Sequence, residues 1–193
     1  MNIGGHGLRE HISLLMPLFG LITAVWALRL VLYAAGAAPF SILLRIVSVT
    51  VAGALAILLA VLMIHRRRFG AYTNVVAAVF LLIVWEELLI SAAIAFAAFT
   101  GTGNAYSAPE FSFGQDAWRH IAGHLTLSIG FETIVGSGMA CVLLMMLRHI
   151  DPVEGQGRAA SGRKQRAVPP HPRPDPTNST RAGAGSGPAK LSE

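Results

Sequence analysis

Four long apolar runs dominate the pattern of hydrophobic and polar positions. They cover roughly residues 12–35, 40–64, 73–99 and 120–147. Each run exceeds the ~20 residues that an α-helix needs to cross about 30 Å of hydrocarbon. Stretches such as 79–84 are continuously apolar, whereas the strands of a membrane barrel alternate with period two. The pattern therefore predicts an all-α integral membrane protein, in which residues 1–150 form a four-transmembrane-helix bundle.

Composition agrees with a membrane protein and separates off a tail. Hydrophobic residues make up 53% of the 193 residues and charged residues only 13%, with a mean hydropathy of +0.57. From residue 151 the chain becomes rich in Pro, Gly, Ser, Ala and Arg. Such a segment buries too little apolar area to offset its chain entropy. We expect residues 151–193 to be disordered, and their lack of interleaved aromatic residues predicts no specific nucleic-acid partner.

Basic residues set the expected orientation, because Lys and Arg concentrate in cytoplasmic loops. Arg66–Arg68 lie between the second and third runs, and Arg148 and the basic tail follow the fourth run. These ends should be cytoplasmic, which places both termini inside the cell (inner) membrane. The loop 100–119 carries one arginine, and its Tyr106 and Trp118 are expected to anchor it at the outer interface.

Three glutamates interrupt the apolar runs and predict a buried polar layer. Glu86 and Glu87 lie in the third run and Glu132 in the fourth, all roughly 20 Å from the predicted inner ends. Arg29 of the first run lies at a similar depth, so it is the expected counter-ion. Three carboxylates and one guanidinium do not balance, which favours a site for a proton, a cation or a small ligand. A purely structural ion pair that fixes helix register is the alternative.

The two adjacent glutamates should face different neighbours, because they point about 100° apart on a helix. Glu87 is followed one turn later by Ser91, which continues a polar stripe, whereas Glu86 is followed by Ile90. We therefore expect Glu87 to face the interior, and Glu86 either to share that site or to face another subunit.

Polar residues recur at four-residue steps in the fourth run: His120, His124, Ser128 and Glu132. His120 and His124 have the spacing of two metal ligands on one helix, and Glu110 or Asp116 would add oxygen ligands. The same ridge would relay protons from the outer surface to Glu132. Hydrogen bonds from the histidines to loop carbonyls are a simpler interpretation, and all three stay open.

Histidines also mark the predicted inner ends of three runs: His11, His65 and His149. Two of them on facing helices would suffice to hold a b-type haem. The simpler interpretation is that they are interfacial side chains at helix ends.

Pro17 bears on where the first span begins. Proline is best tolerated in the first turn of a helix, so its position predicts a span that begins near Met16.

The sequence supports three functional hypotheses. The first is a non-catalytic accessory subunit of a larger membrane complex, with the buried Glu/Arg layer binding a proton, a cation or a small ligand. The second is a metal- or haem-binding oxidoreductase component. The third is a small homodimeric transporter. The chain has no nucleotide loop, no CxxC motif and no nucleophile elbow, so an enzyme is the less expected class.

Overall fold

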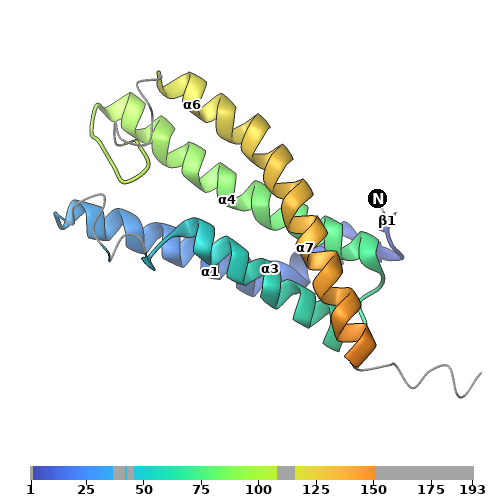
Figure 1. The fold of residues 1–193 in the computed structure, drawn as a ribbon. Helices are drawn as coiled ribbons and strands as arrows, with labels where there is room; N and C mark the ends of the chain where they lie inside the picture. Colours follow the sequence, from blue (N-terminus) through green and yellow to red (C-terminus); the bar gives the residue numbers. More distant parts are fainter. Residues whose placement is uncertain (1, 37–41, 43–45, 108–115, 151–193) are drawn as a thin grey trace, which may run out of the picture. The chain divides into compact units, whose positions relative to one another are not determined.

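The computed structural model describes residues 2–36, 42, 46–107 and 116–150, and it is mainly helical (Figure 1). Its long helices are α1 (Leu8–Ala34), α3 (Val49–Arg66), α4 (Tyr72–Thr100) and a continuous helix made of α6 (Ala117–Gly123), η1 (His124–Ser128) and α7 (Ile129–Ile150). All four are long and apolar enough to cross a membrane, as the hydrophobic runs predict. The predicted disordered tail, 151–193, lies outside the described residues.

The first helix begins earlier than Pro17 suggested. It starts at Leu8, where the Glu10 carboxylate accepts a hydrogen bond of 3.0 Å from the Gly7 amide, and it continues through Pro17. Proline removes one helical hydrogen bond. Buried leucines on either side of it, including Leu14 and Leu18, fix both halves in the core. The helix therefore begins ahead of Met16, and the start of the membrane span near Met16 stays a prediction.

The second helix is shorter than its apolar run. Ser48 has extended backbone angles, φ −105° and ψ 133°, so α3 begins at Val49 and has 18 residues. That length is at the lower limit for crossing the hydrocarbon layer. The early part of the run, residues 40–41 and 43–45, lies outside the described residues.

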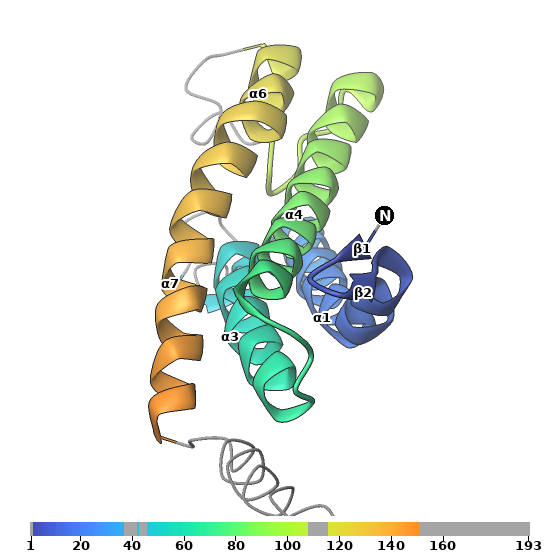
Figure 2. The ribbon, with the colours of Figure 1, turned by 90° about the vertical axis from the view of Figure 1, so that its right-hand side faces the viewer.

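Helix α4 is the centre of the bundle and contacts α1, α3 and α7. In the most hydrophobic 18-residue stretch of each helix, 50% of the residues are buried in α4 but only 11% in the fourth helix. The fourth helix runs along one edge of the bundle in Figure 2. Small residues allow these helices to approach closely. Ala56 and Ala60 of α3 are buried, and a Cβ at Gly136 would lie 3.1 Å from Val79 of α4.

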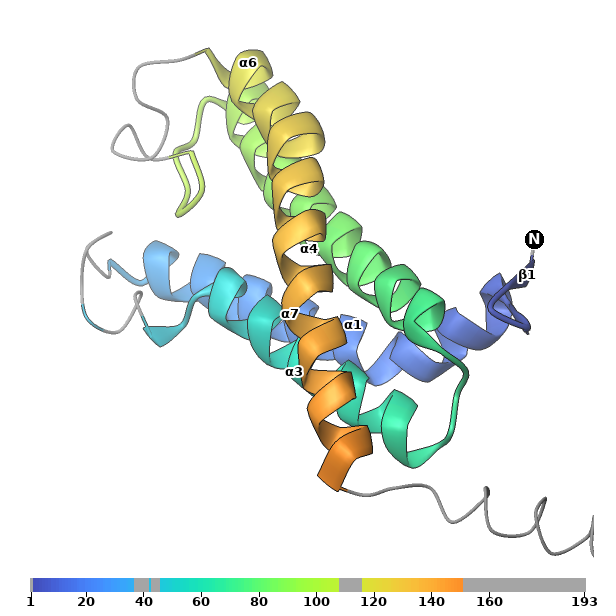
Figure 3. The ribbon, with the colours of Figure 1, turned by 45° about the vertical axis from the view of Figure 1, so that its right-hand side comes forward.

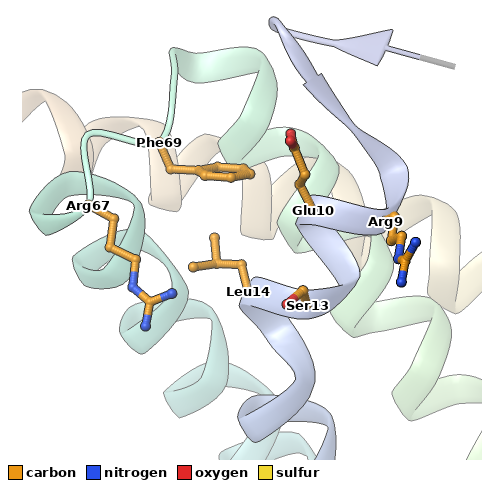
Figure 4. Close-up of a pocket in the computed structure, with 6 residues that line it drawn as sticks. All are labelled: Arg9, Glu10, Ser13, Leu14, Arg67 and Phe69. Carbon is orange, nitrogen blue, oxygen red and sulfur yellow. The ribbon is translucent and has the colours of Figure 1, made fainter.

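The basic residues gather at one end of the bundle. Arg148 of α7 donates a 3.0 Å hydrogen bond to the Gly70 carbonyl in the loop between α3 and α4. At the same end a cavity of about 330 Å³ lies between the first turns of α1 and the end of α3, with Arg9 and Arg67 in its lining (Figure 4). Helix ends that are distant in sequence therefore place their arginines at the same end of the bundle.

A short hairpin precedes α1 at this end. Strand β1 (Asn2–Ile3) pairs antiparallel with β2 (His6–Gly7) through Gly4 and Gly5, which both have positive φ. The Asn74 side chain of α4 donates a 3.2 Å hydrogen bond to the Gly4 carbonyl. A Cβ at Gly4 would overlap that Asn74 amide, so glycine is needed there for space as well as for backbone conformation.

Candidate functional site

A chain of hydrogen bonds links the buried carboxylate of α4 to the histidines of the fourth helix. Glu87 Oε2 lies 2.6 Å from His124 Nδ1, and His124 Nε2 lies 3.2 Å from His120 Nε2. The Glu87 side chain is only 2% exposed and that of His124 is 23% exposed. Glu87 faces the interior, as we expected from the sequence. Its hydrogen-bond partner is His124, whereas we had expected Arg29 as the counter-ion.

The geometry restricts where the protons of this chain lie. A Glu87 carboxylate accepts a hydrogen bond only from a protonated His124 Nδ1. A neutral His124 then has a bare Nε2, which accepts from His120 Nε2–H, whereas a cationic His124 donates to both partners. When one of the two histidines is cationic, moving one proton between the Nε2 atoms interconverts two satisfied states: a cationic His120 that donates to a neutral His124, and a cationic His124 that donates to a neutral His120.

Glu86 is buried as deeply as Glu87 but against a different helix. Its side chain is 4% exposed, and its carboxylate lies over Gly53 of α3, where any Cβ would overlap it. Within the described residues it has no hydrogen-bond partner. The structure thus directs Glu86 to a neighbouring helix of its own chain. Sequence reasoning missed Gly53, although a glycine inside an apolar run was a signal for close approach.

A π-helical turn aligns Glu132 with the histidines. In a regular α-helix, the 12 residues from His120 to Glu132 would rotate the two side chains about 120° apart. The π-turn η1 absorbs one extra residue, which reduces this difference to about 20°. The Thr126 hydroxyl supports the irregular turn by donating a 2.6 Å hydrogen bond to the Ala122 carbonyl.

Glu132 belongs to the same electrostatic cluster. Glu87 and His124 are the charged groups that act on it, and Glu132 and Glu87 act in turn on Glu86. The depth count from the sequence placed these three carboxyls at one level, and the packing of α4 against the fourth helix brings them together. Three like charges in a poorly hydrated interior repel strongly.

Arg29 joins the cluster through a cavity of about 340 Å³. The cavity is lined by Arg29, His120, His124 and Tyr106, among others. The Arg29 guanidinium lies 5.2 Å from the centre of the Tyr106 ring. Tyr106 is 7% exposed, so the expectation that it anchors the loop at the membrane surface is wrong, and burial raises the pKa of its hydroxyl. Trp118, in contrast, is 58% exposed.

Of the residues proposed as metal ligands, the structure brings the two histidines together but not the acidic residues. The facing Nε2 atoms of His120 and His124 are close enough to share an ion, but the described residues offer no group of three His, Cys, Asp or Glu for one. Asp116 instead caps α6 through a 2.8 Å bond from the Arg119 amide, and Glu110 is outside the described residues.

His11 is the histidine that departs most from expectation. It is fully buried, not interfacial. Its Nδ1 lies 3.0 Å from the Gly7 carbonyl and its Nε2 lies 3.0 Å from Asn74 Oδ1, so both ring nitrogens are engaged. That arrangement disfavours haem ligation by His11, and of the other two candidates His149 is exposed and His65 is half-buried.

These features define a class: a helical protein with four potential membrane spans and a buried carboxylate–histidine cluster. Comparison with known proteins adds no closer assignment, since no family model, curated protein or solved structure matches the chain.

Proposed function

We propose that this chain is a small multi-pass protein of the inner membrane whose buried cluster binds and transfers protons, as a non-catalytic subunit of a larger complex. The observation that carries the proposal is the hydrogen-bonded chain from Glu87 through His124 to His120. Its two proton arrangements are what a relay requires. The cavity beside the histidines supplies a route on which water would continue the relay.

The charge balance of the cluster supports the same proposal. Glu86, Glu87 and Glu132 repel one another when ionised, and the nearby groups able to carry positive charge are Arg29 and, when it is protonated, His124. Ionising all three carboxyls in a low-dielectric interior would be costly, so at least one of them holds a proton. A cluster that shares protons among coupled groups accepts or releases one at little cost.

Infrared spectroscopy of the purified protein in lipid bilayers tests the proposal. Protonated carboxyl groups absorb separately from carboxylates, so a pH titration should show a band that changes with proton uptake. We expect Glu87→Gln to remove or shift this band while the protein still inserts and folds, because glutamine keeps the size and loses the titrating group.

Asp116→Asn is the matched control, since asparagine also caps a helix and Asp116 lies outside the cluster. It should leave the band unchanged. If Glu86→Gln, Glu87→Gln and Glu132→Gln all give the wild-type titration, the cluster does not bind protons and the proposal fails. Mild-detergent purification addresses the complex: recovery of the chain alone at native expression would contradict the accessory-subunit role.

A metal site is the second candidate, favoured by the 3.2 Å approach of His120 Nε2 and His124 Nε2. A carboxylate that orients a metal-binding histidine, as Glu87 would orient His124, is common around such sites. Metal analysis distinguishes the candidates. Stoichiometric zinc or copper that is lost in His124→Ala would favour the metal site over the relay.

A further inference from the structure

The N-terminal hairpin is tied to the start of α4 by a short chain of polar contacts. Figure 3 shows the hairpin at the beginning of α1, on the end of the bundle where α4 begins. His11 Nδ1 lies 3.0 Å from the Gly7 carbonyl, and His11 Nε2 lies 3.0 Å from Asn74 Oδ1. The amide of Asn74 in turn lies 3.2 Å from the Gly4 carbonyl. His11 and Asn74 are both 0% exposed, so bulk water does not reach either side chain.

Both ends of this Gly7–His11–Asn74–Gly4 chain are carbonyl oxygens, which accept hydrogen bonds and never donate them. A neutral histidine has one donor and one acceptor nitrogen, and an asparagine amide also has one group of each kind. If a neutral His11 donates to Gly7, Asn74 must donate to His11, and the Asn74 oxygen then faces the Gly4 carbonyl. If a neutral His11 donates to Asn74, its bare Nδ1 faces the Gly7 carbonyl. Either choice leaves two acceptors in contact.

A cationic His11 removes this conflict. With a proton on each ring nitrogen it donates to both Gly7 and Asn74, and Asn74 Nδ2 then donates to Gly4. All three contacts become hydrogen bonds, and no neutral form of His11 achieves this for either orientation of the Asn74 amide. The Glu10 carboxylate, which interacts electrostatically with His11, supplies negative charge close to the imidazolium.

Other groups near the chain that carry or gain charge come from each surrounding element: His6 of the hairpin, Arg9 of α1, Arg67 at the end of α3 (Figure 4) and Arg148 of α7. The arginines stay charged at every pH used for proteins. His6 is therefore the group that has to be separated from His11 in a titration. Its ring lies 6.4 Å from the His11 ring. It hydrogen-bonds to Glu10 at 3.0 Å and stacks on Phe69 at a centroid separation of 3.9 Å.

We propose that His11 is a second proton-binding site and that its imidazolium form holds the hairpin against α4. When the hairpin leaves, Gly4 no longer faces Asn74, so the Asn74 amide turns and donates to a neutral His11 without conflict. The docked hairpin therefore binds the proton more tightly than the undocked hairpin does. By reciprocity, docking is most stable at low pH and weakens as the pH rises and His11 loses its second proton.

The site shares no residue with the Glu87–His124–His120 chain of the proposed relay. Failure of either proposal therefore leaves the other unaffected, and variants at His11 or Asn74 should not change the infrared titration of the carboxylate–histidine cluster.

Nitrogen NMR of ring-labelled histidine in lipid bilayers tests the protonation of His11, because the ring nitrogens of an imidazolium resonate differently from those of either neutral tautomer. His11→Gln identifies the His11 signal by its loss. His149, exposed at the end of α7, is the reference in the same chain. We expect His11 to keep both protons to a higher pH than His149 does. A neutral His11 at a pH where His149 is cationic would overturn the proposal.

Asn74→Leu tests the source of this preference. Leucine has about the volume of asparagine and offers no acceptor to His11 Nε2, so a neutral His11 that donates to Gly7 is then satisfied. The proton affinity of His11 should fall about three- to tenfold, which lowers the midpoint of its titration by about 0.5–1 pH unit. The midpoint of His149 should stay the same. An unchanged His11 midpoint in this variant would also overturn the proposal.

Pulsed electron paramagnetic resonance between two spin labels tests docking of the hairpin. The labels are attached at Asn2→Cys on β1 and Ala71→Cys at the start of α4, on a Cys141→Ala background. Both positions are exposed. The distance distribution should be narrow at about pH 6 and should broaden as the pH rises through the range in which His11 loses its proton.

His6→Phe is the matched control, because it keeps a ring stacked on Phe69 and removes the other titrating group of the hairpin. It should retain the pH-dependent broadening, whereas His11→Gln should abolish it. The proposal is overturned if the distance distribution stays constant while His11 titrates. It is equally overturned if His6→Phe abolishes the change, since His6 would then be the group that controls docking.

Discussion

Gly53 determines whether Glu86 can occupy its buried position. A Cβ at residue 53 would overlap the Glu86 carboxylate, so Gly53→Ala forces the carboxylate or the α3 backbone to move. Overpacking of this kind costs about 1–3 kcal/mol. We expect Gly53→Ala to lower the unfolding free energy by that amount in detergent, measured by chemical denaturation.

Gly138→Ala is the control, because nothing lies within 4 Å of a Cβ at that site in α7. It should be neutral or stabilising by about 0.5–1 kcal/mol, as alanine suits a helix better than glycine. Combining Gly53→Ala with Glu86→Ala should remove most of the penalty. A penalty that persists in the double variant would show that Gly53 serves α3 itself and not Glu86.

Single residues are also where sequence reasoning was least complete. It picked out all three buried glutamates, because charge inside an apolar run is visible without a structure. It did not pair Glu87 with His124 or see that His11 is bound by Asn74, since those contacts depend on how helices rotate against each other. The rotation of each helix about its axis is set by many small packing contacts together, so it cannot be predicted from any single residue.

At the scale of elements, the apolar runs located the four long helices because each must be long enough to cross the bilayer. Their limits were harder. Ser48, whose extended backbone precedes α3, does not interrupt the apolar pattern around it, and the π-turn η1 does not change the hydrophobic pattern either. Residues at four-residue steps gradually turn away from one face of a regular α-helix, so His120 and Glu132 would point in different directions. The π-turn η1 compensates for this rotation.

The π-turn should tolerate loss of one residue. Deleting Leu127, which is 77% exposed in η1, would convert the turn to regular α-helix and keep α7 in register with its neighbours. We expect the unfolding free energy to change by no more than about 1 kcal/mol, roughly 2–4 °C in melting temperature. Deleting the exposed Met139 instead rotates the rest of α7 by about 100° and withdraws Ala140 and Leu144 from the core.

Thermal unfolding of the two deletion variants in the same detergent makes this comparison. The Met139 deletion should be much less stable than the Leu127 deletion. Equal losses in both variants would mean that η1 is not an absorbed insertion, and the proposed alignment of Glu132 with the histidines would lose its basis.

At the scale of the whole molecule, orientation connects the buried cluster to one side of the membrane. Three helix ends each place an arginine at the end of the bundle where the loop between α3 and α4 lies, and Lys and Arg favour the cytoplasmic side. We therefore expect this loop inside the cell and the loop after α4 outside. The histidine pair would then exchange protons with the outer side.

Cysteine labelling in intact cells tests the orientation on a Cys141→Ala background, which removes the single native thiol. A thiol introduced by Thr102→Cys should react with a membrane-impermeant maleimide before lysis, and one introduced by Ala71→Cys only after it. Both positions are exposed and at helix ends, so access to reagent and not burial decides the result. The opposite pattern would turn the relay toward the cytoplasm, because the Glu87–His124–His120 chain is fixed relative to these loops by the packing of α4 against the fourth helix.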